Sequence, residues 1–443
     1  MCDVSAILAT NTSTLNVDLI AAAAPAFDAK GSVLGMHFFS PAHLMKLVEV
    51  VRGQHTGRCA LQGVLALTKA MGKVGVVVGN CDGFVGNRVL DPYSYEAVFC
   101  IEEGASPLLV DAALNSGKGV AALKMAAANA ARAAGNPPLP SGKGAEPIDA
   151  LWGEGGARFE SGAFGGFGGG GGGGGSGSGG FGMAMGPLEM ADLAGGDIGY
   201  NVRRERGLLD PKERARKTHA PSFAAAASGA LPIRYCELGD KLVEAGRVGH
   251  KTGKGWYNYT PPAAAAGSIG KGEGKSHARP PPLGIDGGVD EEVKELIRAH
   301  RAAKGVVSDY PHDDGSGASE SVVWPPTVTA TEVQERLLFG LVNEAFKVLE
   351  EGILEKPSDL DVIYVFGYGF PDWRGGPFFW ADNEVGLAAL LRGVRKYERR
   401  FPNVPHWLPS RLLVALVEAG APLAHWRQHL PHGNATDRRQ SRL

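Results

Sequence analysis

Short apolar runs alternate with longer amphipathic stretches along the first 85 residues. The apolar pattern predicts strands at 6–9, at both ends of 33–51 and at 74–78, and helices at 15–24 and 61–71. Strands that alternate with helices are typical of a doubly wound α/β sheet. We therefore predict that this region is the end of such a domain.

Beyond residue 86 the spacing of apolar positions becomes helical, and the helical pattern occurs twice. Arg88-Val-Leu recurs as Arg336-Leu-Leu, 248 positions later. Gly186-Pro recurs as Gly376-Pro, but only 190 positions later. An internal repeat of this length predicts two similar helical units.

The difference between the two offsets means that the first copy carries about 58 extra residues. They fall in an interval that contains the Ala-rich segment 120–134 and the Gly/Ser-rich segment 165–182. Both have too little apolar bulk to form a core, so we expect a low-complexity insertion at 118–181. Residues 261–288, rich in Pro, Ala and Gly, are expected to form a linker.

Composition excludes several classes of protein. A chain of 443 residues with 44% apolar residues can form two or three ordinary domains, and a net charge of −2 argues against a nucleic-acid partner. No apolar window of about 18 residues predicts a membrane span. The five cysteines contain no Cys-x-x-Cys pair, so neither a disulfide framework nor a metal site is expected.

His37 and Glu49 are the first candidates for chemistry. If residues 40–43 (Ser-Pro-Ala-His) reverse the chain, the flanking strands pair in antiparallel fashion and His37 lies opposite Glu49. An imidazole oriented by a carboxylate can transfer a proton near neutral pH. Their spacing alone is also consistent with two unrelated surface residues.

Five segments, taken in order, resemble the L-3-hydroxyacyl-CoA dehydrogenase family. They are residues 7–15, 35–43, 79–88, 185–192 and 249–257. The Ser-Pro-Ala-His form, together with the second helical copy, most resembles the peroxisomal multifunctional β-oxidation enzymes, which join this dehydrogenase to an enoyl-CoA hydratase.

The resemblance implies the fold class: the α/β remnant of a Rossmann-type NAD-binding domain followed by two all-α dehydrogenase C-terminal repeats. The expected layout is 1–85 for the end of the NAD-binding domain, 86–260 for the first helical domain with its insertion, 261–288 for the linker, 289–428 for the second repeat and 429–443 for a tail. In the family, the opening strand and glycine-rich turn that bind the cofactor precede the segment seen here, so we expect them upstream of residue 7. Family helical units of this type mediate dimerisation, so the resemblance is also compatible with an oligomer.

The resemblance further implies the reversible oxidation of an L-3-hydroxyacyl-CoA to a 3-ketoacyl-CoA in fatty-acid β-oxidation. NAD takes the hydride, and the protein takes the hydroxyl proton. By resemblance, His37 is the base, Glu49 orients it, and Ser13 lies near the nicotinamide and the substrate hydroxyl. Asn87 binds the thioester carbonyl and Lys251 contacts the cofactor.

The residues alone leave simpler roles open for part of this set. Ser13 is equally consistent with a helix N-cap, Asn87 with a polar residue that opens a helix, and Lys251 with a solvated loop lysine. In the second repeat, Gln334 and Glu335 flank the place of Asn87, and no His/Glu pair precedes them. We therefore interpret the second repeat as structural support.

The aromatic residues of the second repeat are expected to form core. They are Tyr368, Phe370, Trp373, Phe378, Phe379 and Trp380. A shared acyl-binding surface is the alternative interpretation of this cluster.

The last residues, Ser441, Arg442 and Leu443, are a variant of the Ser-Lys-Leu peroxisomal address. They predict binding to the peroxisomal import receptor and a place in the peroxisomal matrix.

A second hypothesis treats the chain as a catalytically inert fragment whose helical repeats serve as an interaction or oligomerisation module. A sheet that starts near residue 7 exposes an unpaired edge. We accordingly do not expect this chain alone to bind NAD properly.

Overall fold

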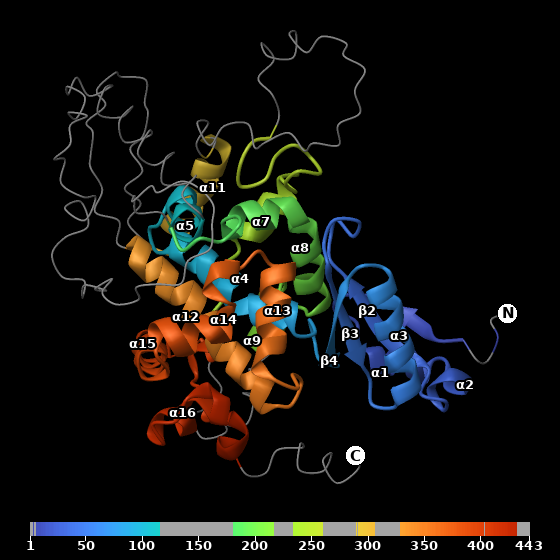
Figure 1. Cartoon of the computed structure of the whole chain (residues 1–443). Helices are drawn as coiled ribbons and strands as arrows, with labels where there is room; N and C mark the ends of the chain where they lie inside the picture. Colours follow the sequence, from blue (N-terminus) through green and yellow to red (C-terminus); the bar gives the residue numbers. More distant parts are fainter. Residues whose placement is uncertain are drawn as a thin grey trace, which may run out of the picture.

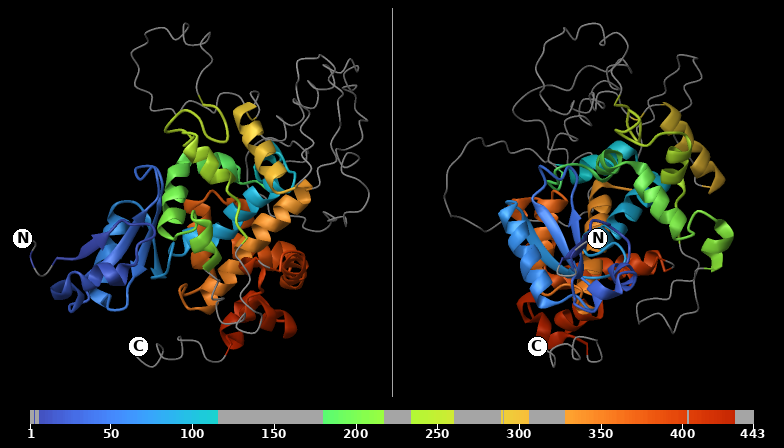
Figure 2. Two further views of the ribbon diagram at one scale, coloured as in Figure 1. Left: turned by 180° about the vertical axis from the view of Figure 1, so that it is seen from behind. Right: turned by 90° about the vertical axis from the view of Figure 1, so that its right-hand side faces the viewer.

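The computed structural model of the chain describes residues 3, 6–115, 180–216, 234–259, 289, 291–305, 328–402 and 404–431. A small α/β sheet unit lies beside a larger helical unit (Figure 1). Seen from behind, the sheet unit again lies at one side of the helices, and in the view turned by 90° it faces the viewer (Figure 2). The expected insertion up to residue 179, the expected linker and residues 432–443 lie outside the described residues.

The sheet contains β1 (Leu8–Thr10), β2 (Val33–Phe38), β3 (Leu47–Arg52) and β4 (Val74–Gly79). The strands adjoin in that order, with β1 parallel to β2, β2 antiparallel to β3 and β3 parallel to β4. Its helices are α1 (Val17–Ala22), α2 (Pro25–Asp28) and α3 (Arg58–Ala70). The predicted alternation of strands and helices is confirmed.

The helix predicted at 15–24 is confirmed as the shorter α1, and the separate short helix α2 follows it. Ala24, between the two, has a non-helical backbone with φ −126° and ψ 61°. Pro25 follows, and a proline ring disfavours the helical conformation of the residue before it. The side chain of Asn16 caps α1 by accepting hydrogen bonds from two N–H groups of its first turn.

Strand β3 presents its two faces to different surroundings. Val48 and Val50 belong to a small apolar cluster shared with α3. Leu47 and Val51 belong to the large cluster that continues into the helical unit. Side chains alternate along a strand, so Glu49, between Leu47 and Val51, faces the helical unit.

The helical unit contains two groups of helices. The first has α4 (Gly86–Glu102), α5 (Pro107–Leu114), α7 (Pro187–Ala194), α8 (Gly196–Glu205), α9 (Pro211–Arg216), α10 (Leu238–Glu244) and α11 (Glu291–Ala303). Helix α11 lies in the range expected for the second repeat, but it packs against α10 and α4 of the first group. The second has α12 (Ala330–Glu350), α13 (Pro357–Gly367), η3 (Asp372–Arg374), α14 (Pro377–Trp380), η4 (Ala381–Val385), α15 (Leu387–Arg400), η5 (Pro405–Trp407), α16 (Arg411–Glu418) and η6 (Leu423–His429). No helix in the described part of the chain is long and apolar enough to cross a membrane.

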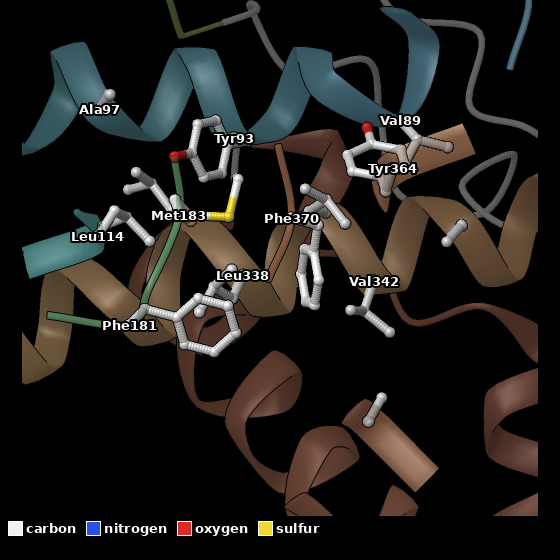
Figure 3. Packing of buried hydrophobic residues seen from close by; sticks show 14 of the residues in the cluster. Val89, Tyr93, Ala97, Leu114, Phe181, Met183, Leu338, Val342, Tyr364 and Phe370 are labelled. Carbon is white, nitrogen blue, oxygen red and sulfur yellow. The ribbon is translucent and has the colours of Figure 1, made fainter. Parts of the chain in front are cut away.

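The long helices α4 and α12, one from each repeat, pack against each other. Tyr93 and Ala97 of α4 lie in one apolar cluster with Leu338 and Val342 of α12 (Figure 3). The predicted repeat is confirmed, and its two copies lie side by side.

Mirrored ion pairs join these two helices. Arg336 of α12 binds Glu96 at 2.6 Å and Glu103 at 2.8 Å, and its side chain is 0% exposed. In the reverse direction, Arg88 of α4 binds Glu344 at 3.0 Å and Glu351 at 2.6 Å. Each arginine thus pairs with the carboxylates that lie 8 and 15 positions after the equivalent arginine of the other copy.

Both repeats also use an aspartate to cap a helix that starts with Gly-Pro, and Asp111 is buried whereas Asp361 is partly exposed. Asp111 accepts hydrogen bonds from the first N–H groups of α7, at 2.8 and 3.1 Å. Asp361 does the same for α14, at 2.8 and 3.4 Å. A side chain at Gly186 or Gly376 would collide with the capping aspartate, so the close approach requires glycine there.

The aromatic core expected in the second repeat is only partly correct. Phe370, Phe378 and Trp380 are buried, whereas Trp373 is 67% and Phe379 is 52% exposed. These two lie on η3 and α14, short helices that can bury only one side. 

Phe181, assigned to the end of the insertion, is buried and packs edge-on against Phe370 and Trp380. The first repeat therefore resumes its core at this residue, earlier than the sequence indicated.

Candidate active site

His37 and Glu49 meet where β2 and β3 pair. The two residues are directly opposite in the antiparallel register, as predicted. The distance from His37 Nδ1 to Glu49 Oε2 is 2.7 Å, and both side chains are buried. Unlike an exposed pair, this one is held in a single geometry by the surrounding sheet.

The second oxygen of Glu49 extends the pair into the helical unit. Glu49 Oε1 accepts a hydrogen bond from the backbone N–H of Gly86, the first residue of α4, at 2.9 Å. Both oxygens are thus engaged, and the positive end of the helix dipole favours a negative charge there. His37 Nδ1 is committed to Glu49, while Nε2 has no hydrogen-bond partner among the described residues.

Two aromatic rings enclose the imidazole. The ring centroids of Phe39 and Phe84 lie 4.6 and 5.9 Å from that of His37. Phe84 is fully buried and has φ +50°, which is uncommon for a bulky residue and frequent at functional sites. The strained turn that contains it leads directly into Gly86 and Asn87.

Asn87, the second residue of α4, joins the sheet unit to both repeats. Its Nδ2 donates to the backbone oxygen of Ser13, at 3.4 Å. Its Oδ1 accepts a hydrogen bond from the hydroxyl of Tyr368, in the second repeat, at 2.8 Å. Ser13 lies in the loop after β1, and the N-cap of the next helix is Asn16, so the N-cap interpretation of Ser13 is wrong.

A cavity of about 320 Å³ opens beside Ser13 and Asn87. Most of it lies within the first repeat, between α4, α7, α8 and α10. Apolar side chains from all four helices line it, among them Leu90, Leu188 and Leu242. It is therefore a largely apolar space that also has polar groups, among them Ser13 and Asn87, in its lining.

Lys251 does not join this group in the structure. Its ammonium pairs with the carboxylate of Asp197, at 2.8 and 3.0 Å, and is about half exposed. It lies next to Gly195, which lines the cavity. The structure thus brings together His37, Glu49, Asn87 and Ser13, while Lys251 lies apart from them, beside Gly195.

Sequence reasoning missed two members of the site. The N–H of Gly86 holds Glu49, and the hydroxyl of Tyr368 holds Asn87. Gly86 lies in a segment that resembles the family, but its bond to Glu49 is made by the backbone N–H, which every residue except proline has. The residue type therefore could not indicate this role. Tyr368 differs from its phenylalanine neighbours in having a polar end, which a buried tyrosine must satisfy.

Family comparisons agree with this architecture. Residues 1–81 match the family model described as 3-hydroxyacyl-CoA dehydrogenase, NAD binding domain. Residues 83–135, 177–259 and 333–424 match the model of the 3-hydroxyacyl-CoA dehydrogenase C-terminal domain. The chain therefore belongs to the 3-hydroxyacyl-CoA dehydrogenase family.

The most similar relatives include peroxisomal bifunctional enzymes. The peroxisomal bifunctional enzyme of Danio rerio is 35% identical over 435 residues, which cover 97% of this chain and 44% of the relative. The human peroxisomal bifunctional enzyme is 34% identical over 428 residues, 96% of this chain and 44% of the relative. The chain thus spans less than half the length of these relatives.

A solved structure supports the fold. The 3-hydroxybutyryl-CoA dehydrogenase of Escherichia coli K12 superposes with a TM-score of 0.51 at 21% identity, over 95% of this chain and 77% of that one. At this identity the likeness concerns the fold alone.

Proposed function

We propose that this chain carries the proton-transfer site of an NAD-dependent dehydrogenase that oxidises L-3-hydroxyacyl-CoA to 3-ketoacyl-CoA, as part of a multifunctional β-oxidation enzyme. The observation that carries the proposal is the buried His37–Glu49 pair, at 2.7 Å, in which Glu49 also binds Gly86, the neighbour of Asn87. Asn87 in turn lines a largely apolar cavity. An acyl-CoA needs such a site, because its reacting carbons are polar and its chain is apolar.

The residues present fit the reactive end of NAD. In α/β sheets, dinucleotides bind at the carboxyl ends of parallel strands. The loop after β1 lies at such an end, and within it Ser13 and Thr14 line the cavity. NAD, when bound there, supplies the acceptor for the hydride that leaves C3 of the substrate.

His37 is proposed to accept the proton of the substrate hydroxyl. Its Nδ1–H donates to Glu49, so Nε2 is the nitrogen with a lone pair for the substrate hydroxyl proton. Protonation makes an imidazolium, and the adjacent carboxylate stabilises that charge. The rings of Phe39 and Phe84 exclude water and so strengthen this interaction.

Asn87 is proposed to bind the thioester carbonyl. An amide N–H directed at an oxygen that gains negative charge stabilises that charge. Lys251, which lies beside Gly195, is proposed to contact the cofactor once its pairing with Asp197 is exchanged for a phosphate. The apolar lining would hold the acyl chain.

The test is NADH-dependent reduction of acetoacetyl-CoA, followed by the loss of NADH absorbance. It is made with the 443-residue chain and with an extended chain, in which the preceding portion of the Danio rerio relative is joined to it. We expect the extended chain to be active and His37→Gln to lower its kcat by 10²–10⁴-fold, with unchanged affinity for NADH. Inactivity of both forms would reject the proposed function, and full turnover by His37→Gln would reject His37 as the base.

We also propose location in the peroxisomal matrix, which the names of the relatives support. Ser441, Arg442 and Leu443 would bind the import receptor; they lie outside the described residues. A fluorescent protein that carries residues 432–443 at its C-terminus should enter peroxisomes, and Leu443→Ala should leave it in the cytosol. The same distribution for both fusions would contradict the proposal.

A further inference from the structure

Tyr368 comes from the second repeat but lies over the start of α4 in the first. It directly follows α13, and its hydroxyl donates to Asn87 Oδ1 at 2.8 Å. Tyr364, one turn earlier, donates to the backbone oxygen of Gly86 at 3.1 Å. The two tyrosine rings stack with centroids 4.8 Å apart. Figure 3 shows Tyr364 against α4 near Val89.

Two glycines make this approach possible. A side chain at Gly86 would collide with the ring and hydroxyl of Tyr368. A side chain at Gly367 would lie 2.6 Å from a methyl group of Leu47, on β3. The ring of Tyr368 also meets Phe39 edge-on at 5.3 Å, and Phe39 in turn packs on His37. The second repeat is thus fitted closely against the candidate active site.

The contact fixes which way the amide of Asn87 faces. The backbone oxygen of Ser13 can only accept a hydrogen bond, so Nδ2 must face Ser13 and Oδ1 must face Tyr368. Burial, together with the charge of Glu49, raises the pKa of Tyr368 well above its usual range, so its hydroxyl stays protonated and donates. With Oδ1 occupied, the second hydrogen on Nδ2 has no partner among the described residues.

We infer that Tyr368 is a positioning residue for the proposed reaction: it holds the Asn87 carboxamide so that an N–H, and not the carbonyl oxygen, meets the thioester oxygen of the substrate. This inference rests on the proposed function. Without the hydroxyl, the amide can rotate by half a turn about its terminal bond and present an acceptor to the substrate oxygen. The second repeat then contributes to catalysis through one hydrogen bond.

Tyr368→Phe tests the inference because it keeps the ring and removes only the hydroxyl. We expect kcat/KM for acetoacetyl-CoA to fall about tenfold in the extended chain, the loss of one hydrogen bond to a polar group. Tyr397→Phe is the matched control: its hydroxyl donates to Glu335 at 2.6 Å, within the second repeat. It should change kcat/KM by less than about twofold. An unchanged kcat/KM in Tyr368→Phe would overturn the inference.

A double-mutant cycle with Asn87→Ala separates positioning from general support. If Tyr368 acts through Asn87, then Tyr368→Phe should cost about tenfold in the wild-type background and almost nothing in the Asn87→Ala background. The same cost in both backgrounds would mean that Tyr368 acts on the fold and not on Asn87, and would overturn the inference.

The affinity for acetoacetyl-CoA, measured by calorimetry without NADH, keeps the two proposals distinguishable. A chain that binds acetoacetyl-CoA but does not reduce it rejects the proposed function, and the cycle is then decided on binding affinity. A wild-type chain that does not bind acetoacetyl-CoA contradicts the inference as well, because Asn87 then holds no thioester.

Discussion

The two helical repeats share a framework but differ at the position where the first one does chemistry. Both use an arginine that pairs across the α4–α12 interface and an aspartate that caps a Gly-Pro helix. Asn87 in the first copy corresponds to Glu335 in the second. Asn87 meets Ser13 and Tyr368 near His37, whereas Glu335 binds Lys396 and Tyr397 inside its own repeat. Residues shared by both copies therefore maintain packing, and the proposed chemistry depends on residues of one copy.

The starts of α4 and α12 explain this difference. Helix α12 begins with a local cap, in which Thr329 Oγ1 accepts the N–H of Glu332 at 3.1 Å. Helix α4 has no side-chain cap of its own, and Glu49 from β3 satisfies the N–H of Gly86. The helix that carries Asn87 is thereby tied to the strand that orients His37. Among the described residues, no strand lies at the equivalent end of the second repeat.

The largest expected effect tests the mirrored ion pairs. Arg336→Met removes the arginine that pairs with the buried Glu96 and leaves that carboxylate only His406 and Trp407 as partners. We expect a loss of about 3–5 kcal/mol in the free energy of unfolding. Arg88→Met should cost roughly 1 kcal/mol, because Arg88 and its partners are partly exposed. Urea unfolding of both variants measures the difference. Equal losses would show that the two mirrored sites are energetically equivalent after all.

Acid should weaken the α4–α12 interface, and more at Glu96 than at Glu344. Burial raises the pKa of Glu96, but Arg336 and His406 outweigh it, and the pKa falls from 4.5 to about 2. The folded state thus binds this proton less readily than the unfolded chain, so the stabilisation is complete above pH 4.5 and is lost as the pH falls toward 2. Glu344, its counterpart, also has a lowered pKa, mainly through Lys347 and Arg88 acting against burial.

Urea unfolding between pH 5 and 2 measures this effect. Glu96→Gln should flatten the loss of stability with acid, and Glu344→Gln should flatten it less. If neither variant changes the slope, the interface is not a source of acid sensitivity.

Glu49, which holds the start of α4, and Thr329, which caps α12, can be compared in the same way, with smaller expected effects. Glu49→Gln removes the charge that stabilises a protonated His37, and we expect kcat to fall roughly tenfold. Thr329→Ala removes the cap of α12 and should cost about 1 kcal/mol of stability with no change in kcat. Turnover of acetoacetyl-CoA and thermal unfolding, measured on both variants, separate the two effects. A matching loss of kcat in Thr329→Ala would contradict the division between the repeats.

Local pattern was sufficient to predict most of the framework. Alternating apolar runs predicted the four strands, a reversal at residues 40–43 predicted the register of His37 and Glu49, and constant offsets revealed the repeat. Each of these depends on residues that are close in sequence or on a direct comparison of two segments.

Contacts between distant segments could not be predicted in this way. The bond from Gly86 to Glu49 spans 37 positions and the bond from Tyr368 to Asn87 spans 281. The burial of Phe181 and the exposure of Trp373 likewise depend on which elements pack around them. These features depend on tertiary packing, which cannot be deduced from residue type and spacing alone.

The most direct test of the difference between the repeats is kcat/KM for acetoacetyl-CoA in Asn87→Ala and Glu335→Ala, two substitutions at equivalent positions, made in the extended chain. We predict a loss of about 10²-fold for Asn87→Ala, the cost of removing one donor to a developing oxyanion, and less than about twofold for Glu335→Ala. Equal losses in the two variants would contradict the account.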